Sequence, residues 1–464
     1  MKRLALLLLT AGLAMPAVAQ EKVDLIVYGD YVLTMEEGEP VIESGGVAIS
    51  GERIVAVLPR TALDERYAAD RVIPGDDRVV LPGLINGHGH SAMTMFRGMV
   101  DDLGLMTWLN DYIFPMEGRF VDPAFVRTGS TLACLEMIRG GTTTFVDMYF
   151  YPDEIAGVVD RCGLRAVIAA PHIDFPSPGF KGWDDSFAAA SDFVKRWSGK
   201  HPRIRPAFGP HAPYTVSPEH IAATADRAAG QTPVSMHLSE APVEMETILA
   251  AHGRTPVAHV KAQGMLGPNL IAAHMAVLTD EDIELVAANG VGVIHNPTSN
   301  LKVGAGVARV PAMLDAGIDV GLGTDGAGSN NDLDLWEEIR LAALLHKGMS
   351  GDPTAVPART ALSMATRRGA AAIGWGNEIG QLKPGMQADL IQVTTGELHR
   401  MPLYDIVSHL VYVLDASDVT TTIVAGQVLM EDRFVTTIDE AALSRDVKAL
   451  SDAISSALRA ETPR

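Results

Sequence analysis

The feature that most constrains the fold is a series of short apolar runs that alternate with segments of helical periodicity. Continuous apolar runs of this length are typical of buried parallel strands. Helices are expected between them at 122–139, 218–229, 280–289 and 333–346. Eight strand–helix repeats that close on themselves predict a distorted (β/α)8 barrel of the TIM type over residues 81–383. The eight runs are VVLPGLIN, TTTFVDM, RAVIAA, RPAFGP, PVSMHL, LIAAH, VGVIHN and DVGLGTD.

The two ends of the chain differ from this central part in their sequence pattern. Residues 20–80 and 384–436 contain short alternating stretches broken by Gly and Pro, such as GGVAISGERIVAVLP and TTTIVAGQVLMEDRFV. This pattern indicates strands and hairpins, and it predicts one small β-sandwich-like domain assembled from both chain ends. Residues 437–464 are predicted to form a C-terminal helix. A length of 464 residues is sufficient for a barrel with a second, smaller domain.

Residues 1–19 resemble a cleavable signal peptide. Lys2 and Arg3 precede an apolar core, and Ala17-Val18-Ala19 supplies the small residues of a cleavage site. The apolar run is too short to span a bilayer comfortably, which disfavours an uncleaved anchor. We therefore expect a periplasmic or secreted protein with no stable membrane anchor after cleavage. A formal net charge of −20 argues against a nucleic-acid partner, because phosphate binding requires clustered Lys and Arg.

Cys134 and Cys162 are the only cysteines. They do not form a paired motif, so they give no support to a cysteine-ligated zinc site. We expect two separate buried thiols, and a single disulfide in an oxidising compartment remains the alternative.

Metal-type side chains close several of the apolar runs. His88 and His90 follow the first run, His237 lies in the fifth and Asp325 ends the eighth. Side chains at the carboxyl ends of barrel strands lie on the face where such barrels build their active sites. Three imidazoles and one carboxylate suit one divalent ion, most typically Zn²⁺, with Fe²⁺ and Mn²⁺ as alternatives. Such an ion lowers the pKa of a coordinated water molecule to about 7 and so provides hydroxide at neutral pH.

Further residues near these runs have the chemistry of proton transfer. Glu240 follows His237 by three residues and is a candidate proton carrier between the coordinated water and a substrate ring nitrogen; a supporting hydrogen bond is the alternative. His274 fits either a further ligand or a catalytic imidazole. Asp325 is expected both to bind the metal and to accept the proton of the attacking water. His211, at the end of the fourth run, is expected to contact substrate rather than metal.

Two sequence features that are absent restrict the kind of metal site and the class of deaminase that the chain can contain. The fourth run ends in FGPHAPYT, without a lysine that could bridge two metal ions, which favours a single ion. The H-x-E and P-C-x-x-C pattern of cytidine-type deaminases is also missing. The role of His295 stays open.

The motifs PGLINGHGH, FGPHAPYT, HLSE, AAHMAVL, HNPTSNLK and LGTDGAGSNNDLD resemble the amidohydrolase superfamily. Within it, the chain is most similar to the methylthioadenosine/S-adenosylhomocysteine deaminases of the chlorohydrolase and aminohydrolase branch. The resemblance extends over essentially everything after the signal peptide. It implies metal binding by His88, His90, His237 and Asp325, and catalytic roles for Glu240 and His274.

The segment from Ser91 to Phe120 is similar to the family's substrate loop. The resemblance implies that Trp108 lines a purine pocket, that Glu117 accepts hydrogen bonds from ribose hydroxyls and that His211 contacts the heterocycle. Without it, Trp108 would be interpreted as a core aromatic and Glu117 as a surface charge.

The predicted function is hydrolytic deamination of a purine nucleoside with release of ammonia, methylthioadenosine or S-adenosylhomocysteine being examples. The alternatives are displacement of chloride or an alkylamine from a triazine-like ring and deamination of another aminated heterocycle. The stretch AAPHIDFPSPGFKGWDD offers no arginine for a homocysteine carboxylate. Arg165 precedes the third predicted strand, and we do not expect it to reach the pocket. A non-catalytic periplasmic binding protein is disfavoured by the intact proton-carrying residues. A homo-oligomer is usual for proteins of this kind.

Overall fold

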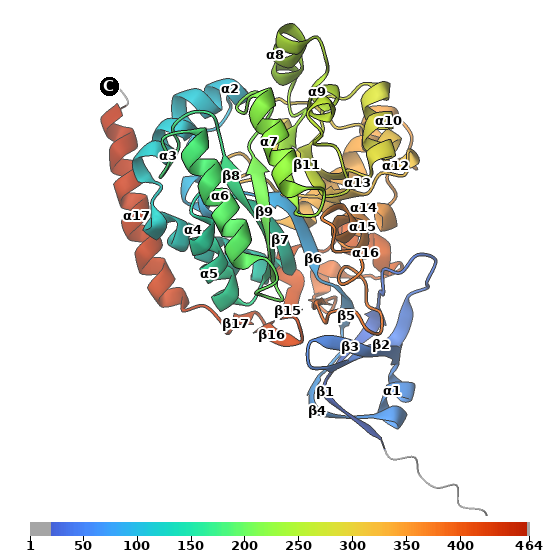
Figure 1. Cartoon of the computed structure of the whole chain (residues 1–464). Helices are drawn as coiled ribbons and strands as arrows, with labels where there is room; N and C mark the ends of the chain where they lie inside the picture. Colours follow the sequence, from blue (N-terminus) through green and yellow to red (C-terminus); the bar gives the residue numbers. More distant parts are fainter. Residues whose placement is uncertain (1–19, 462–464) are drawn as a thin grey trace, which may run out of the picture.

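Eight parallel strands form the barrel of the computed structural model, which describes residues 20–461 (Figure 1). Neighbouring strands pair in chain order from first to last. The ring closes between the last strand and the first, where the Asp325 N–H donates to the His88 carbonyl at 3.0 Å. The predicted barrel is therefore confirmed. Its strands are β6 (Leu84–Gly89), β7 (Thr142–Met148), β8 (Arg165–His172), β9 (Ile204–Pro210), β10 (Val234–Leu238), β11 (Leu270–His274), β12 (Gly292–His295) and β13 (Val320–Leu322).

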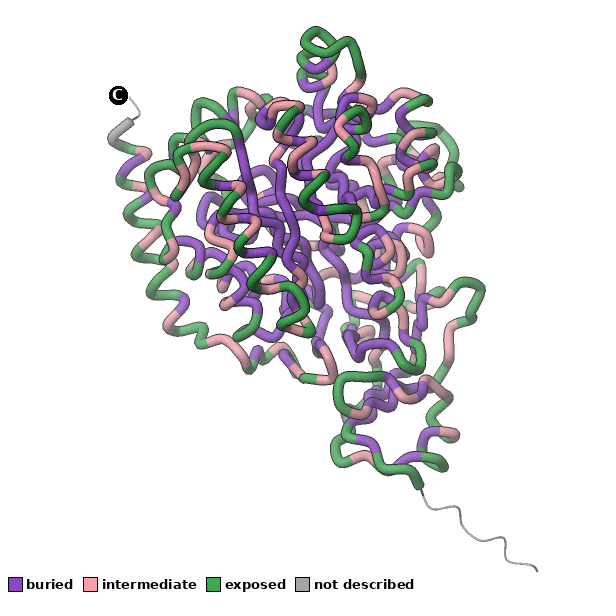
Figure 2. Tube along the Cα trace, viewed as in Figure 1, coloured by how far each residue is buried: buried purple, intermediate pink, exposed green. Residues whose placement is uncertain are grey.

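The interior of the barrel is filled with side chains. Ile85, Val167 and Ile294 from three of its strands belong to one buried cluster that also includes Trp375 and Ile379. Trp375 and Ile379 follow α15 (Arg367–Ala372), and α15 itself contributes Ala370 and Ala372 to the same cluster. In Figure 2 the strands at the centre are buried, and the helices around them are exposed on their outer faces. The barrel interior is therefore a packed core and not a channel.

Helices surround the barrel, and their ends have clear local signals. The Asp122 side chain accepts from the Phe125 N–H at 2.8 Å, and Gly141 follows in the left-handed conformation at φ 81°. Thr279 and Asp282 form a capping box. All four predicted helices are found. The surrounding helices are α4 (Pro123–Gly140), α5 (Pro152–Cys162), α6 (Trp183–Trp197), α7 (Pro218–Ala228), α8 (Pro242–His252), α9 (Pro256–Ala262), α10 (Asp280–Asn289), α11 (Pro297–Lys302), α12 (Val310–Asp315), α13 (Leu335–Ser350), α14 (Ala358–Met364) and α16 (Ile406–Tyr412).

The first predicted barrel strand, VVLPGLIN, is divided into two strands that belong to different sheets. Its first half is β5 (Arg78–Pro82), which pairs with β1 and β14 outside the barrel. Gly83 separates it from β6. The Gly83 N–H donates to the Asp389 carbonyl at 3.1 Å, and a Cβ at this position would lie 2.1 Å from the Thr143 side chain. Only glycine fits this close crossing of the chain.

The second sheet joins strands from both ends of the chain, as predicted. Its order is β17-β16-β15-β14-β5-β1-β2-β3, with β4 paired to β1. Helix α1 (Arg60–Arg66) connects two of its strands. The domain boundaries predicted from sequence stay predictions. The strands are β1 (Glu21–Val32), β2 (Ile42–Ser50), β3 (Arg53–Pro59), β4 (Tyr67–Ile73), β5, β14 (Leu390–Thr394), β15 (Val419–Val424), β16 (Gln427–Glu431) and β17 (Phe434–Val435).

A buried ion pair joins the barrel to this second sheet. Arg165 Nε lies 2.8 Å from Asp389 Oδ2, and its Nη2 lies 3.1 Å from Oδ1. The two side chains are only 1% and 2% exposed. Arg165 is thus committed to the base of the barrel, in agreement with the expectation that it does not reach the substrate.

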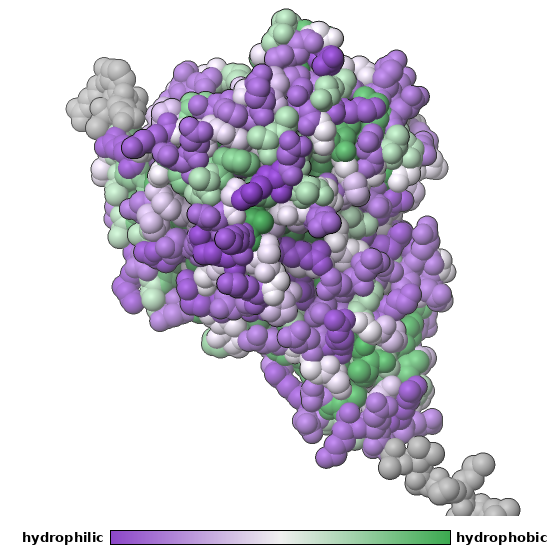
Figure 3. All heavy atoms as spheres, in the orientation of Figure 1, coloured by the Kyte–Doolittle hydropathy of each residue, from purple (hydrophilic) through white to green (hydrophobic). Residues whose placement is uncertain are grey.

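The chain ends in α17 (Glu440–Glu461), a long helix that packs on the outside of the barrel beside α4 (Figure 1). Arg139 forms an ion pair with Glu440 at its first turn, at 2.8 Å. Within residues 20–461, no helix is both long enough and apolar enough to cross a membrane. The predicted signal peptide at 1–19 lies outside the described residues. The face drawn in Figure 3 is largely hydrophilic, with apolar side chains gathered mainly over the small sheet.

Candidate metal centre and active site

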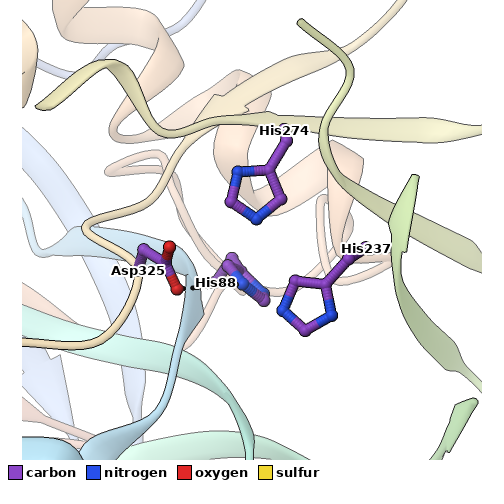
Figure 4. A group of neighbouring side chains, drawn as sticks. All are labelled: His88, His237, His274 and Asp325. Atoms are coloured by element: carbon purple, nitrogen blue, oxygen red, sulfur yellow. Dashed lines mark ion pairs between the residues drawn. The ribbon is translucent and has the colours of Figure 1, made fainter. Parts of the chain in front are cut away.

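Three imidazoles and one carboxylate meet at the carboxyl end of the barrel strands. His88 comes from β6, His237 from β10 and His274 from the end of β11, while Asp325 follows β13. One ligand-type atom from each of the four residues lies within 4.8 Å of the others. Figure 4 shows the three rings directed toward a common centre, with the Asp325 carboxylate facing His88. All four residues are buried.

His90 also belongs to this cluster. Its Nε2 lies 3.2 Å from Asp325 Oδ1 and 3.2 Å from His237 Nε2. The four predicted ligands are therefore brought together, and His274 lies beside them as a fifth candidate. The group of four whose ligand-type atoms all lie within 4.8 Å of one another contains His274 and not His90. The division into ligands and catalytic residues stays a prediction.

Hydrogen bonds orient two of the imidazoles for metal binding. His90 Nδ1 donates to the Met148 carbonyl at 2.6 Å, and His237 Nδ1 donates to the His211 carbonyl at 2.7 Å. A ring nitrogen that donates to a carbonyl fixes the tautomer, so the Nε2 lone pair of each ring is directed toward the cluster. This arrangement is typical of histidines that bind metal ions.

The burial and charge of the cluster fit a cation. Both ring nitrogens of His88 and Nε2 of His274 are buried without a hydrogen-bond partner, an unfavourable state that a bound ion would relieve. Burial lowers the pKa of His88 to about 4, which keeps the ring neutral and able to coordinate. Burial raises the pKa of Asp325, but the neighbouring imidazoles of His88, His90 and His274 together hold that pKa well below its usual value. The donor set suits one divalent ion of the zinc type.

Polar neighbours hold Asp325 in place. Ser299 and Ser329 donate to its Oδ2 at 2.7 and 3.0 Å, so Oδ1 is left facing the imidazoles. The backbone of Asp325 has a φ of 62°, and that of His274 has a φ of 76°. Left-handed backbone at residues other than glycine is strained and concentrates at functional sites. In both cases the turn occurs where the strand ends and brings the side chain over the barrel mouth.

Glu240 and His274 form a second pair beside the cluster. Glu240 Oε1 lies 3.8 Å from His274 Nε2. Tyr214 donates to Glu240 Oε2 at 3.2 Å, and His274 Nδ1 donates to Asn300 Oδ1 at 2.8 Å. Burial raises the pKa of Glu240. The pair can therefore hold and pass a proton next to the candidate metal centre.

A pocket opens above these groups. His90, His237, Glu240 and Asp325 form its polar end. The remaining walls are mainly aromatic and aliphatic, as in pockets that bind flat organic ligands. They comprise Met93, Leu105, Trp108, Leu109, Ile113, Phe114, Glu117, Met148, Tyr149, Phe150, Pro171, Ile173, His211 and Tyr214.

The three predicted substrate residues all line this pocket. Trp108 and Glu117 are only 7% and 4% exposed, so Glu117 is not a surface charge. Burial raises the pKa of Glu117 to about 7 and lowers that of His211 to about 3. His295, whose role was left open, is buried beside His346, with ring centroids 5.4 Å apart, and does not line the pocket.

Sequence reasoning missed several residues that support the site. Tyr214 and Asn300 lie inside the motifs FGPHAPYT and HNPTSNLK, but nothing in those motifs marks them as partners of Glu240 and His274. Tyr149 and Phe150 follow β7 directly, and their position after a barrel strand was the signal that could have found them.

Comparison with known proteins places these features in one family. Residues 79–429 match the Amidohydrolase family. A 5-methylthioadenosine/S-adenosylhomocysteine deaminase of Syntrophobacter fumaroxidans is 44% identical over 90% of this chain and 95% of its own length. A 5'-deoxyadenosine deaminase of Methanosarcina barkeri is 43% identical over 92% of this chain and 98% of its own.

Two crystal structures with bound zinc have the same fold. An adenosine deaminase from Xanthomonas campestris superposes with a TM-score of 0.92 at 39% identity, over 94% of this chain and 100% of the other. Atrazine chlorohydrolase TrzN from Arthrobacter aurescens TC1 superposes with a TM-score of 0.84 at 26% identity, over 92% and 100%. The chain described here belongs to the amidohydrolase family.

Proposed function

We propose that this protein is a metal-dependent deaminase that hydrolyses the exocyclic amino group of adenosine-type nucleosides, such as methylthioadenosine or S-adenosylhomocysteine. The observation that carries the proposal is the Glu240–His274 pair, 3.8 Å apart, at the polar end of a pocket with an aromatic wall. Deamination requires a proton carrier at this place, because an amine must be protonated before it leaves. The names of the relatives support the same chemistry.

We assign the metal ion, most simply Zn²⁺, to His88, His90, His237 and Asp325. The family resemblance leaves His274 for catalysis, and its Nε2 lies 3.8 Å from Glu240 Oε1, the proposed proton carrier. Zinc in two related structures supports the choice of metal. Bound at these residues, the ion would supply a water molecule of lowered pKa as the nucleophile.

The side chains around the pocket then carry out the proton transfers of the reaction. Glu240, whose pKa is raised by burial, donates a proton to a ring nitrogen and makes the amino-bearing carbon electrophilic. Asp325, whose pKa is held low, accepts a proton from the attacking water, and His274 orients that water. Asp325 then passes its proton to the amino group, ammonia leaves, and the hydroxyl proton of the adduct returns to Glu240, which gives the keto product. One nucleoside and one water molecule yield the keto product and ammonia, with no covalent enzyme intermediate.

Residues farther from the metal would position the nucleoside. Trp108 packs against the purine, His211 contacts the heterocycle and Glu117 accepts hydrogen bonds from ribose hydroxyls. None of the residues that line the pocket is a lysine or an arginine. A homocysteine carboxylate would therefore find no cation within it, so methylthioadenosine and adenosine fit at least as well as S-adenosylhomocysteine.

The proposal is tested by ammonia release from the purified, metal-analysed protein. The panel holds adenosine, methylthioadenosine, S-adenosylhomocysteine, guanine, cytosine and aminotriazines. We expect release from the adenosine compounds. If a protein with about one metal ion bound per chain releases ammonia from none of these compounds, the proposed substrate class is wrong. Halide release from a chlorotriazine would favour the alternative function, for which the similarity to atrazine chlorohydrolase TrzN is the supporting observation.

We further propose that the chain is exported and acts in the periplasm or outside the cell, as a homo-oligomer. The charged start, apolar core and small-residue site within residues 1–19 support export. Cell fractionation of the full chain, with sequencing of its mature N-terminus, tests this. A start at Gln20 in the periplasmic fraction is expected, and an unprocessed chain in the cytoplasm would contradict it.

A further inference from the structure

The two cysteines of the chain meet within the wall of the barrel. Cys134 lies on α4 and Cys162 is the last residue of α5. They are 28 residues apart in the sequence, yet their Sγ atoms lie 2.8 Å apart. Both are free thiols in the structure, and the residues are 0% and 2% exposed. The expectation of two buried, unbridged thiols therefore agrees with the structure, which in addition places the two sulfurs in direct contact.

This contact is too close for two independent thiols. Packed non-bonded carbon atoms lie ~3.5–4.0 Å apart, and sulfur is larger than carbon. A disulfide has an S–S distance of about 2.05 Å, so less than about 1 Å of movement separates this pair from a bond. The helices that carry the two residues already pack against each other.

Other uses of a thiol pair fit this site poorly. Burial raises the pKa of Cys134 well above its usual value, which leaves an unreactive neutral thiol. Neither residue lines the active-site pocket. Among the residues that the structure describes, the one group of side chains arranged to hold a metal ion is the histidine–aspartate cluster, which contains no cysteine. A catalytic or metal-binding role is therefore disfavoured, and a structural cross-link remains.

We propose that Cys134 and Cys162 form a structural disulfide between α4 and α5 when the chain folds in an oxidising compartment. The oxidant is a disulfide of the thiol-exchange class, carried by a protein or a small molecule. Each cysteine loses its thiol proton, the pair loses two electrons as the S–S bond forms, and the oxidant is reduced to two thiols. Since both sulfurs are buried in the native state, the bond closes before the two helices have finished packing.

The position of this bond gives it a structural purpose. It closes a loop that contains the end of α4, all of β7 and α5. The Thr437 hydroxyl donates to the Cys162 carbonyl at 2.8 Å, so the segment that leads into α17 is fastened to the same point. The enclosed strand ends at Met148, whose carbonyl orients His90. The cross-link thus stabilises the part of the barrel wall between the C-terminal helix and the candidate metal centre.

The first test is a thiol count on the full chain, expressed with its own leader and taken from the periplasmic fraction. Free thiols are alkylated under denaturing conditions, with and without prior reduction, and the peptides are identified by mass spectrometry. We expect no free thiol before reduction, two after it, and a cross-linked Cys134–Cys162 peptide pair about 2 Da lighter than the reduced peptides together. Two free thiols in the periplasmic protein would overturn the proposal.

A second test does not depend on export or on deamination. The purified, reduced chain is refolded in a glutathione redox buffer. We expect the intramolecular bond, and stable glutathione adducts on either cysteine would contradict it. The reductant should lower the midpoint of thermal unfolding of the oxidised chain by several degrees, whereas a C134S/C162S double variant should not respond. An oxidised wild-type chain that is equally insensitive to reductant would show that no stabilising bond had formed.

Discussion

The backbone N–H of Glu240 donates to Oε2 of Glu244 at 2.7 Å, and the N–H of the preceding Ser239 donates to Oε1 at 3.0 Å. Glu244 is completely buried in the first turn of α8. Ser239 has a φ of 50°, so the chain turns sharply just before Glu240. One carboxylate therefore holds the turn that presents the proposed proton carrier to the pocket.

Replacing Glu244 by Gln should impair turnover more than substrate binding. An amide offers one acceptor oxygen where two N–H groups need one each, so the turn loses a hydrogen bond and leaves a buried N–H without a partner, at a cost of ~1–3 kcal/mol. We expect kcat to fall by roughly 10- to 100-fold, with KM and metal content little changed. Glu246, exposed on the same helix, provides the matched control as Glu246→Gln. A kcat equal to that of the control would refute the positioning role.

Glu240→Gln tests the proton carrier itself. The amide keeps the shape of the side chain but cannot donate the proton that activates the ring. Turnover should fall by ~10² or more, the scale of lost general acid–base catalysis. Metal content, measured by elemental analysis, should stay at the wild-type level because Glu240 is not an assigned ligand. Unchanged turnover would remove Glu240 from the mechanism.

Substrate affinity should depend on pH through Glu117. Burial raises its pKa to about 7, so the carboxylate is charged above that pH and protonated below it. The charged form is the better acceptor for ribose hydroxyls, so KM should rise as the pH falls from about 8 to 6. Glu117→Gln should flatten this dependence. With the wild-type protein, the KM of a dideoxynucleoside, which lacks both ribose hydroxyls, should not depend on pH in this range. If KM depends on pH in Glu117→Gln as it does in the wild type, the assignment of Glu117 is contradicted.

Metal removal should lower stability as well as activity. An ion that binds only the native state stabilises it by about 2.7 kcal/mol at a free concentration 100-fold above its Kd. A chelator should therefore lower the thermal midpoint, and added Zn²⁺ should restore it. His237→Ala should contain little metal and respond weakly to the chelator. His399→Ala, at an exposed position, serves as the control and should behave as wild type.

The buried pair of Arg165 and Asp389 should be sensitive to the loss of one partner. Asp389→Ala leaves an uncompensated buried charge, and we expect the free energy of unfolding to fall by ~3–5 kcal/mol. An R165M/D389L double variant should recover much of this loss. The exposed pair of Arg71 and Glu431 offers a contrast, because Glu431→Ala should cost ~1 kcal/mol or less. Denaturant titration measures all three variants, and equal losses for Asp389→Ala and Glu431→Ala would contradict the assigned importance of burial.

The barrel and the metal-type cluster could be predicted because both depend on local patterns. Buried parallel strands are continuously apolar, and residues that directly follow them share one end of the barrel. This is why His88, His237, His274 and Asp325 could be expected together before any coordinates were known. The division of VVLPGLIN could not be predicted, because both of its halves are apolar and only the packing of Gly83 against Thr143 separates them.

Contacts between residues that are far apart in the sequence could not be predicted, for a different reason. Tyr214 and Glu240 are 26 residues apart, as are His274 and Asn300, and no periodicity relates them. The thiol contact depends on how α4 and α5 pack against each other. Such relationships are fixed by tertiary packing, which composition and spacing do not specify.

The second sheet has a consequence for the order in which the protein can be completed. Strand β5 is made early, but its neighbour β14 arrives late: Arg78 bonds to Thr394, 316 residues farther along the chain. Until then β5 presents an open edge, which invites pairing with other chains. A copy truncated before β14 keeps that edge permanently. The open edge of β5 is therefore covered only in a chain that extends through β14.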